Sequence, residues 1–311
     1  MNCTEASQEK TWKPILYLKA LRAPFLVATT LPMMLGALLS SNEKDLQMLL
    51  FILTIACGAL INLATNTLND YFDYLKGCDH KETPQTPFSG GSGLIVDGCL
   101  TPDEVSGLSG VLVFAALATG LSILTLSPAN PLIILLLGLT GIFLGYAYSA
   151  PPLRLSSRGL GEIAVFAACG PLSVMAPYYI MCGNFSTTSL IASLPPGLMT
   201  TAILWINQFP DFETDKKAGK KNLLVRIGRE NGRYIYLILI LTAATSLLFA
   251  ATCSFLPMRS LWGLLFLIPL VHASKVLFNS FQSPTKLIPA MALTIVSQAI
   301  LSIAMILAVT G

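Results

Sequence analysis

Nine apolar stretches, each close to twenty residues long, divide almost the whole chain. A transmembrane α-helix needs roughly 20 mostly apolar residues, so each stretch is long enough to cross a bilayer. Only 11% of the residues are charged, whereas soluble proteins carry about a quarter. The sequence therefore predicts an all-α polytopic membrane protein with nine transmembrane helices. These run at about 23–41, 47–68, 107–126, 131–149, 161–182, 190–209, 234–253, 260–278 and 287–310.

The first 22 residues differ from these stretches because they are polar and amphipathic. They lack the short apolar core and small-residue cleavage site of a signal peptide. We expect residues 1–22 to form a helix on the membrane surface, with Trp12 and Tyr17 as interface anchors.

The basic residues predict the orientation of the bundle. All but two of the 19 Lys and Arg residues lie in the N-terminal segment, in the loops after the second, fourth, sixth and eighth stretches, or beside them; the exceptions are Lys44 and Arg259. Basic residues are enriched in cytoplasmic loops, which places the N-terminus in the cytoplasm and the C-terminus on the opposite side. The net charge of +3 thus describes one membrane face and does not indicate nucleic-acid binding.

Two long cytoplasmic segments, 69–106 and 210–233, carry most of the acidic residues, and we expect them to form cap loops. Their starts repeat one pattern: Asn66-x-x-x-Asp70 is echoed by Asn207-x-x-x-Asp211, and Asp73 and Asp215 follow. Residues three or four apart share a helix face, so each group projects to one side. Two facing carboxylate clusters would repel each other unless cations lay between them.

Hard divalent cations bind oxygen ligands, and Mg²⁺ in particular is held by one or two carboxylates together with substrate phosphates. His80 and His272 are far apart in the sequence, which argues against a zinc site. A position at the start of a helix accounts for Asp103, Glu104 and Glu162 without any role in metal binding. The sequence therefore favours Mg²⁺, with Mn²⁺ as an alternative, and the candidate ligands are Asn66, Asp70, Asp73, Asp79, Asn207, Asp211 and Asp215.

Basic residues beside the second cluster suit a phosphate ligand, although membrane topology alone also selects cytoplasmic Lys and Arg. Lys220 and Arg226 are the stronger candidates because they follow the second cluster directly, and Arg offers paired donors to phosphate. The segment PFSGGSGLIVDG (87–98) is rich in glycine. It could wrap backbone N–H groups around an anion, or it could be a flexible lid.

Four segments in order resemble the UbiA superfamily of intramembrane prenyltransferases: LRAPFL, NDYFDYLKGCD, YSAPPLRLSSRGLGE and NQFPDFETDKKAGKKNLLVRIG. The resemblance covers essentially the whole chain, 1–311, as one prenyltransferase domain. It implies nine helices around a central cavity open to membrane lipid and roofed by cytoplasmic cap loops. Within the superfamily the chain is most similar to the branch that prenylates 1,4-dihydroxy-2-naphthoate in menaquinone synthesis. Five residues separate Asp73 from Asp79. Relatives that act on 4-hydroxybenzoate tend to have only three residues at the corresponding place, so the chain departs from that branch.

The resemblance implies an activity as well as a fold. Mg²⁺ held by Asp70, Asp73, Asp211 and Asp215 would bridge the diphosphate of a polyprenyl donor, and its loss would leave an allylic cation. An aromatic acceptor would attack that cation. With dihydroxynaphthoate, CO₂ would depart on the way to demethylmenaquinone. The implied substrate-binding residues are Arg22 (for the acceptor carboxylate), Asn66, Asn69, Lys76, Tyr148, Arg154, Asn207, Lys220 and Arg226.

Other functions stay open at this point. The shared motifs also suit 4-hydroxybenzoate, homogentisate, a porphyrin or a glycerol phosphate as acceptor. A secondary transporter is the alternative from another class, because transporters too combine many spans with acids near the membrane. Transporter sites usually lie near the bilayer midplane, however, whereas these acids gather at one face.

Overall fold

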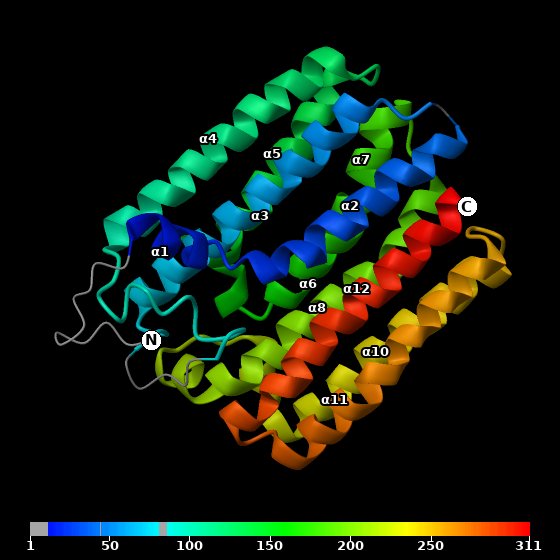
Figure 1. Ribbon diagram of the computed structural model, residues 1–311. Coiled ribbons are helices and arrows are strands. Elements are labelled where there is room, and N and C mark those ends of the chain that lie inside the picture. The colour runs from blue at the N-terminus through cyan, green and yellow to red at the C-terminus, as the bar shows by residue number, and fades with distance from the viewer. Residues whose placement is uncertain (1–11, 44, 81–85) are drawn as a thin grey trace.

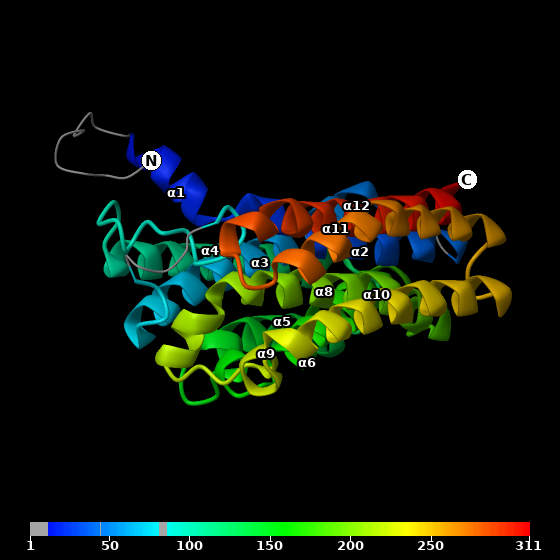
Figure 2. The same ribbon diagram turned by 90° about the horizontal axis from the view of Figure 1, so that it is seen from below.

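The computed structural model describes residues 12–43, 45–80 and 86–311. In both views the long helices run side by side along one common direction (Figures 1 and 2). Within the described ranges, nine helical segments are long and apolar enough to cross a membrane. The predicted nine-helix architecture is therefore confirmed. The segments are Lys13–Leu39, Met48–Lys76, Pro102–Leu126, Pro131–Ser149, Gly161–Cys182, Thr187–Lys217, Arg229–Thr252, Met258–Ser280 and Pro284–Thr310.

The first segment is broken near its start. Helix α1 (Lys13–Ala20) ends before Arg22, whose φ of 52° is left-handed; the turn η2 (Ala23–Leu26), helix α2 (Val27–Leu39) and the turn η3 (Ser40–Asn42) follow. Figure 2 shows α1 at an angle to the bundle. Residues 1–11 of the predicted surface helix lie outside the described residues, so its place on the membrane stays a prediction.

The next three segments are single helices, α3 (Met48–Lys76), α4 (Pro102–Leu126) and α5 (Pro131–Ser149). Thr101 and Glu104 form the capping box that starts α4, as their sequence predicts,. Gly77, with φ 78°, ends α3, and its N–H contacts the Asp73 and Tyr74 carbonyls,.

The fifth segment is irregular, and the sixth is long. Helix α6 (Gly161–Ala167) passes into a π-helical turn η5 (Ala168–Leu172) and then α7 (Ser173–Cys182). The turn contains Pro171, which has no N–H to continue the α-helical ladder. The short turn η4 (Leu155–Ser157) precedes α6.

Helix α8 (Thr187–Lys217) is followed by the short helix α9 (Leu223–Ile227). The last three segments are α10 (Arg229–Thr252), η6 with α11 (Met258–Phe266, Leu267–Ser280) and η7 with α12 (Pro284–Leu287, Ile288–Thr310). Helix α1 and the C-terminal end of α12 lie at opposite ends of the bundle (Figure 1).

The expected cap loops are shorter than the segments 69–106 and 210–233. Helix α3 continues to Lys76 and α8 to Lys217, so both acidic clusters lie on the last turns of helices and not in loops. The change from apolar to polar side chains marks the end of the apolar stretch in each helix, but the helical backbone hydrogen bonds continue beyond it. This matters for function, because helical backbone holds the carboxylates at fixed positions.

Helix α8 is the centre of the bundle, with 72% of its most apolar 18 residues buried inside the protein. Its Trp205 and Phe209 pack in the largest core cluster, together with Tyr236 of α10. Where α8 crosses η5 the backbones touch: a Cβ on Gly197 would lie 2.8 Å from the Gly170 Cα. Close packing on several sides holds the acidic end of α8 in place.

Candidate active site

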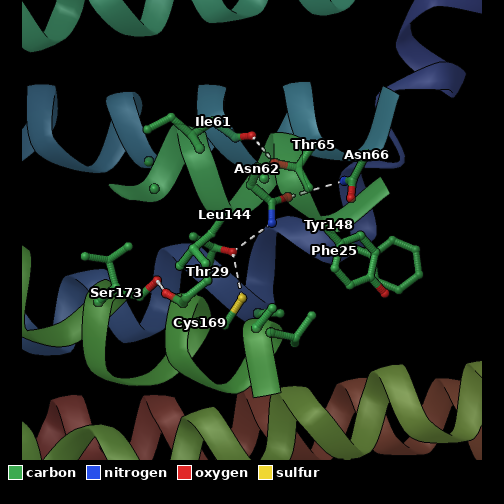
Figure 3. Close-up of a pocket in the computed structure, with 18 of the residues that line it drawn as sticks. Phe25, Thr29, Ile61, Asn62, Thr65, Asn66, Leu144, Tyr148, Cys169 and Ser173 are labelled. Atoms are coloured by element: carbon green, nitrogen blue, oxygen red, sulfur yellow. Dashed lines mark hydrogen bonds between the residues drawn. The ribbon is translucent and has the colours of Figure 1, made fainter. Parts of the chain in front are cut away.

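A cavity of about 580 Å³ lies inside the bundle. Its walls come from α2, α3, α4, α5, the η5–α7 region and α8, and apolar side chains such as Ile61 and Leu144 cover much of them (Figure 3). At one end the lining changes to charged residues, among them Asp73, Asp211 and Lys220. The cavity is therefore amphiphilic, with a charged end and an apolar body.

Helix α3 supplies the first acidic cluster, Asp70 and Asp73, both buried. Asp70 pairs with Arg22 at 3.5 Å and accepts the Ser92 N–H at 2.9 Å. Asp73 accepts a hydrogen bond from Asn69 Nδ2 at 2.9 Å, one turn earlier on the same helix face. The i, i+4 spacing read from the sequence thus acts within this cluster.

Helix α8 supplies the second cluster, Asp211 and Asp215. Asn222 donates to Asp215 Oδ2 at 2.9 Å, while its own Oδ1 caps α9 by accepting the Val225 N–H at 2.8 Å. Asp211 accepts the Gly90 N–H on Oδ2 at 3.3 Å. Asp211 Oδ1 is buried and has no hydrogen-bond partner among the described residues, so it is free to bind a cation or a donor.

Lys220 joins the two clusters. Its Nζ lies 2.9 Å from Asp73 Oδ2 and 3.5 Å from Asp215 Oδ1. Burial lowers the pKa of Lys220, but Asp215 and Asp73 outweigh it and hold that pKa well above its usual value,. A permanently charged ammonium therefore balances part of the negative charge between α3 and α8.

The glycine-rich segment also joins the clusters, through its backbone. The Gly90 and Ser92 N–H groups bind one carboxylate from each helix, as given above. Gly91, with φ +66°, lies between them, and a Cβ there would be 2.7 Å from Asp79 Oδ2 and 3.1 Å from Asp70 Oδ1. The sequence left two interpretations of this segment, an anion-binding loop or a flexible lid. The structure agrees better with the first, because backbone N–H groups do face anions, although these anions are carboxylates.

Asp79 follows α3 and lines the charged end of the cavity. Burial, with Asp73 and Asp70 nearby, raises the pKa of Asp79 to about 8,. Asp79 thus adds a third carboxyl to those of Asp73 and Asp70 at this end of the cavity.

A chain of hydrogen bonds runs along the cavity wall away from the acids (Figure 3). Asn66 Nδ2 donates to Asn62 Oδ1 at 3.3 Å, and Asn62 Nδ2 donates to Thr29 Oγ1 at 2.8 Å. Thr29 Oγ1 lies 3.8 Å from Cys169 Sγ. These bonds connect α3 to α2 and η5. Polar side chains therefore extend from the acidic end of the cavity into its apolar body.

Most of the predicted site residues meet at this cavity. Its lining includes Arg22, Asn66, Asn69, Asp73, Asp79, Tyr148, Asn207, Asp211, Asp215 and Lys220. Asp70 lies just behind the lining, held by Arg22 and Ser92. Helix periodicity brought the residues of each cluster together, and the bundle brought the two clusters together.

Three predicted basic residues lie elsewhere. Lys76 donates to Ser157 Oγ at 2.6 Å. The Arg226 guanidinium binds the backbone carbonyls of Lys221 and Arg158 at 2.9 Å and 2.6 Å. Arg154 is exposed. None of the three is among the described residues that line the cavity.

Three site residues were not identified from the sequence. Asn222 lines the cavity beside Asp215, and its place before an apolar run was a recognisable helix-start signal. Gln208 and Glu162 are buried and bonded to each other at 2.8 Å. Glu162 does lie in the first turn of α6, as its position suggested, but its side chain points to α8, and no sequence pattern signals that contact.

The donor set at the charged end fits a divalent cation shared with a ligand. Among the described residues, no three His, Cys, Asp or Glu side chains converge as a ready-made metal site. Mg²⁺ needs only one or two carboxylates when substrate phosphates complete its shell. The unpartnered, buried Oδ1 atoms of Asp211 and Asn207 are oxygen ligands of that kind.

Comparison with known proteins identifies the family. The sequence matches the UbiA prenyltransferase family over residues 29–294. It is 29% identical over 263 residues to the UbiA prenyltransferase domain-containing protein 1 homolog of Drosophila melanogaster, covering 84% of this chain and 70% of the fly protein. It is 27% identical over 255 residues to the 1,4-dihydroxy-2-naphthoate octaprenyltransferase of Bacillus subtilis, covering 78% of each chain.

The fold is also similar to that of a solved protein. A UbiA homolog from Archaeoglobus fulgidus, bound to GPP and Mg²⁺, superposes with a TM-score of 0.56 at 20% identity over 92% of this chain and 99% of that one. With the family match covering most of the chain, the conclusion is direct: this protein is a prenyltransferase enzyme that belongs to the UbiA prenyltransferase family.

Proposed function

We propose that this enzyme transfers a polyprenyl group from a polyprenyl diphosphate to 1,4-dihydroxy-2-naphthoate. One observation carries the proposal: the cavity joins two carboxylate clusters and Lys220 at one end to an apolar body. A prenyl diphosphate has the same division, with a charged head and a hydrocarbon tail. Burying the tail in the apolar body removes its surface from water.

The charged end binds the diphosphate head in this proposal. Among the described residues, Lys220 and Arg22 are the basic side chains that line it, and each already pairs with an aspartate. Asp73, Asp79, Asp211, Asp215, Asn207 and Asn66, which line the cavity, would hold Mg²⁺ or Mn²⁺, with Asp70 behind them. The bound cation supplies charge neutralisation for the departing diphosphate.

The reaction breaks the bond between the allylic C1 and the diphosphate oxygen, and the electron pair leaves with the diphosphate. Donors already in place around the leaving group stabilise its charge without reorganising. The apolar walls keep water away from the allylic cation, which water would otherwise capture. Tyr148 and Phe25, which both line the cavity, border this region in Figure 3.

The ring carbon that bears the carboxylate then bonds to C1. The carbon–carbon bond to the carboxylate breaks, CO₂ departs, and its electron pair restores the aromatic ring. The product is the prenylated dihydroxynaphthalene, the reduced form of demethylmenaquinone. Support for this acceptor comes from the curated relatives named as dihydroxynaphthoate octaprenyltransferases in Bacillus subtilis and Escherichia coli. In this proposal Arg22, which lines the same charged end as Lys220, also binds the acceptor carboxylate.

The membrane setting follows from charge. The charged end of the cavity belongs to the loops that hold most of the basic residues, so we place it on the cytoplasmic face of the cytoplasmic membrane. We also treat residues 1–311 as a single prenyltransferase domain. Family membership sets aside the transporter alternative.

The test uses purified protein in detergent with a polyprenyl diphosphate and 1,4-dihydroxy-2-naphthoate. Prenylated product and released CO₂ should appear with Mg²⁺, and both should disappear with EDTA. If 4-hydroxybenzoate, homogentisate, a porphyrin or a glycerol phosphate is prenylated instead, the acceptor assignment is wrong and the donor chemistry stands. If no acceptor is prenylated, the proposed reaction is wrong.

A further inference from the structure

Gln208 lies on α8 about one helical turn before the acidic cluster. It lies three residues before Asp211, which is about 4.5 Å along the helix axis. Both residues line the cavity, and Gln208 is 8% exposed. Because the diphosphate head belongs at Asp211, Gln208 lies at the depth where the allylic C1 and the attacking ring must meet.

Glu162 determines which way the Gln208 amide points. Gln208 Nε2 donates to Glu162 Oε1 at 2.8 Å, and the Leu223 N–H donates to the same oxygen at 3.4 Å. Because Glu162 Oε1 also accepts the backbone N–H of Leu223, this oxygen acts as a hydrogen-bond acceptor,. The amide nitrogen therefore faces Glu162, and a flipped amide would set two oxygens against each other.

The other end of the amide is unsatisfied. Gln208 Oε1 is buried and has no hydrogen-bond partner among the described residues. A buried carbonyl without a donor is costly, so such an oxygen in a binding cavity points to a ligand that supplies one. The prenyl tail has no donor, and an ionised diphosphate has none either. A hydroxyl group on the aromatic acceptor does.

We propose that Gln208 Oε1 accepts a hydrogen bond from a ring hydroxyl of the acceptor, and that Glu162 is a positioning residue that fixes the amide for this contact. The inference rests on the proposed function and deepens it by naming what recognises the acceptor. It makes the enzyme selective for rings that carry a free hydroxyl beside the reacting carbon. A ring without that hydroxyl should bind more weakly, because it leaves the buried carbonyl unpaired.

The experiment compares dihydroxynaphthoate with its two mono-O-methyl ethers as substrates or competitive inhibitors. In the wild-type enzyme, one ether should bind about tenfold more weakly than the parent, the loss expected for one buried hydrogen bond. In Gln208→Met, which keeps the length but has no carbonyl, the parent should lose about tenfold in affinity. The difference between parent and ether should then disappear, while KM for the prenyl diphosphate stays the same.

Two further variants guard the interpretation. Gln298→Met is the matched control: within the described part of the chain, Gln298 is also buried with an unpartnered Oε1, but it lies on α12 and does not line the cavity. It should keep the full discrimination between parent and ether. Glu162→Gln lets the Gln208 amide turn over, so it should reduce that discrimination and leave the thermal unfolding midpoint within a few degrees of wild type.

The outcomes separate the two proposals. If wild-type enzyme prenylates dihydroxynaphthoate but Gln208→Met keeps the same discrimination, the role of Gln208 is wrong and the proposed function stands. If wild-type enzyme prenylates a different hydroxyl-bearing ring, the same comparison with that ring and its methyl ether decides the role of Gln208. If it prenylates no aromatic ring, both proposals are wrong.

Discussion

Lys220 Nζ lies 2.9 Å from Asp73 Oδ2 although the two residues are 147 positions apart in the sequence. The same ammonium is 3.5 Å from Asp215 Oδ1. One side chain thus connects the acidic ends of α3 and α8 across the mouth of the cavity. When a prenyl diphosphate is bound, we expect this ammonium to bind its phosphate oxygens.

Replacing Lys220 by Gln should reduce kcat/KM by about 100-fold or more, as expected when one preorganised donor to a leaving group is removed. The loss should be measured as KM and kcat for the prenyl diphosphate at saturating Mg²⁺. Lys217→Gln is the matched control, since Lys217 is exposed at the end of the same helix. Equal losses in the two variants would show a general effect of loop charge instead.

Removing divalent cations should abolish product formation, because the carboxylates bind the diphosphate only through a cation. Mg²⁺ and an unreactive prenyl thiodiphosphate should stabilise the protein together far more than either does alone. A jointly bound pair present at about 100 times Kd raises the free energy of unfolding by about 2.7 kcal/mol. Thermal unfolding in detergent measures this. In Asp211→Asn the joint effect should vanish, whereas Asp103→Asn at the start of α4 should retain it.

Gly91→Ala should impair both stability and activity, because its Cβ would press on Asp79 and Asp70. Gly98→Ala separates the two causes: Gly98 has a similar φ of +70°, but its Cβ would meet nothing within 4 Å. The left-handed backbone alone should cost about 1–2 kcal/mol in both variants. A loss of activity confined to Gly91→Ala would confirm that the loop holds the carboxylates, and equal activities would contradict it.

Gly197→Ala should destabilise the bundle by about 1–3 kcal/mol, the usual range for overpacking. Its Cβ would lie 2.8 Å from the Gly170 Cα and 3.2 Å from Phe166, so α8 and η5 would have to separate. Gly107→Ala on α4 meets nothing within 4 Å and should stabilise its helix by about 0.5–1 kcal/mol. Chemical denaturation in mixed micelles gives both values; a neutral Gly197→Ala would mean that this crossing tolerates expansion.

Hydrophobic length and residue spacing were enough to predict the helices and the two acidic groups. Hydrophobic length is a local property, so nine spans could be counted without knowing how they pack. Helix periodicity is local too, which is why Asn66, Asp70 and Asp73 could be assigned to one helix face from their spacing; the Asn69–Asp73 bond on α3 has the same i, i+4 spacing but was not predicted. The same reasoning ended the helices early, at 68 and 209, because polarity was taken as the end of the helix.

Tertiary structure alone decided which residues meet across the bundle. Lys220 and Arg226 are equally basic and six positions apart, yet Lys220 lines the cavity and Arg226 binds loop carbonyls. The pairing of Glu162 with Gln208 likewise joins α6 to α8. Such contacts depend on the packing of helices that are far apart in the sequence, and residue spacing does not predict that packing. A helix fixes the direction in which a side chain points, but the neighbouring helix decides which residue that side chain meets.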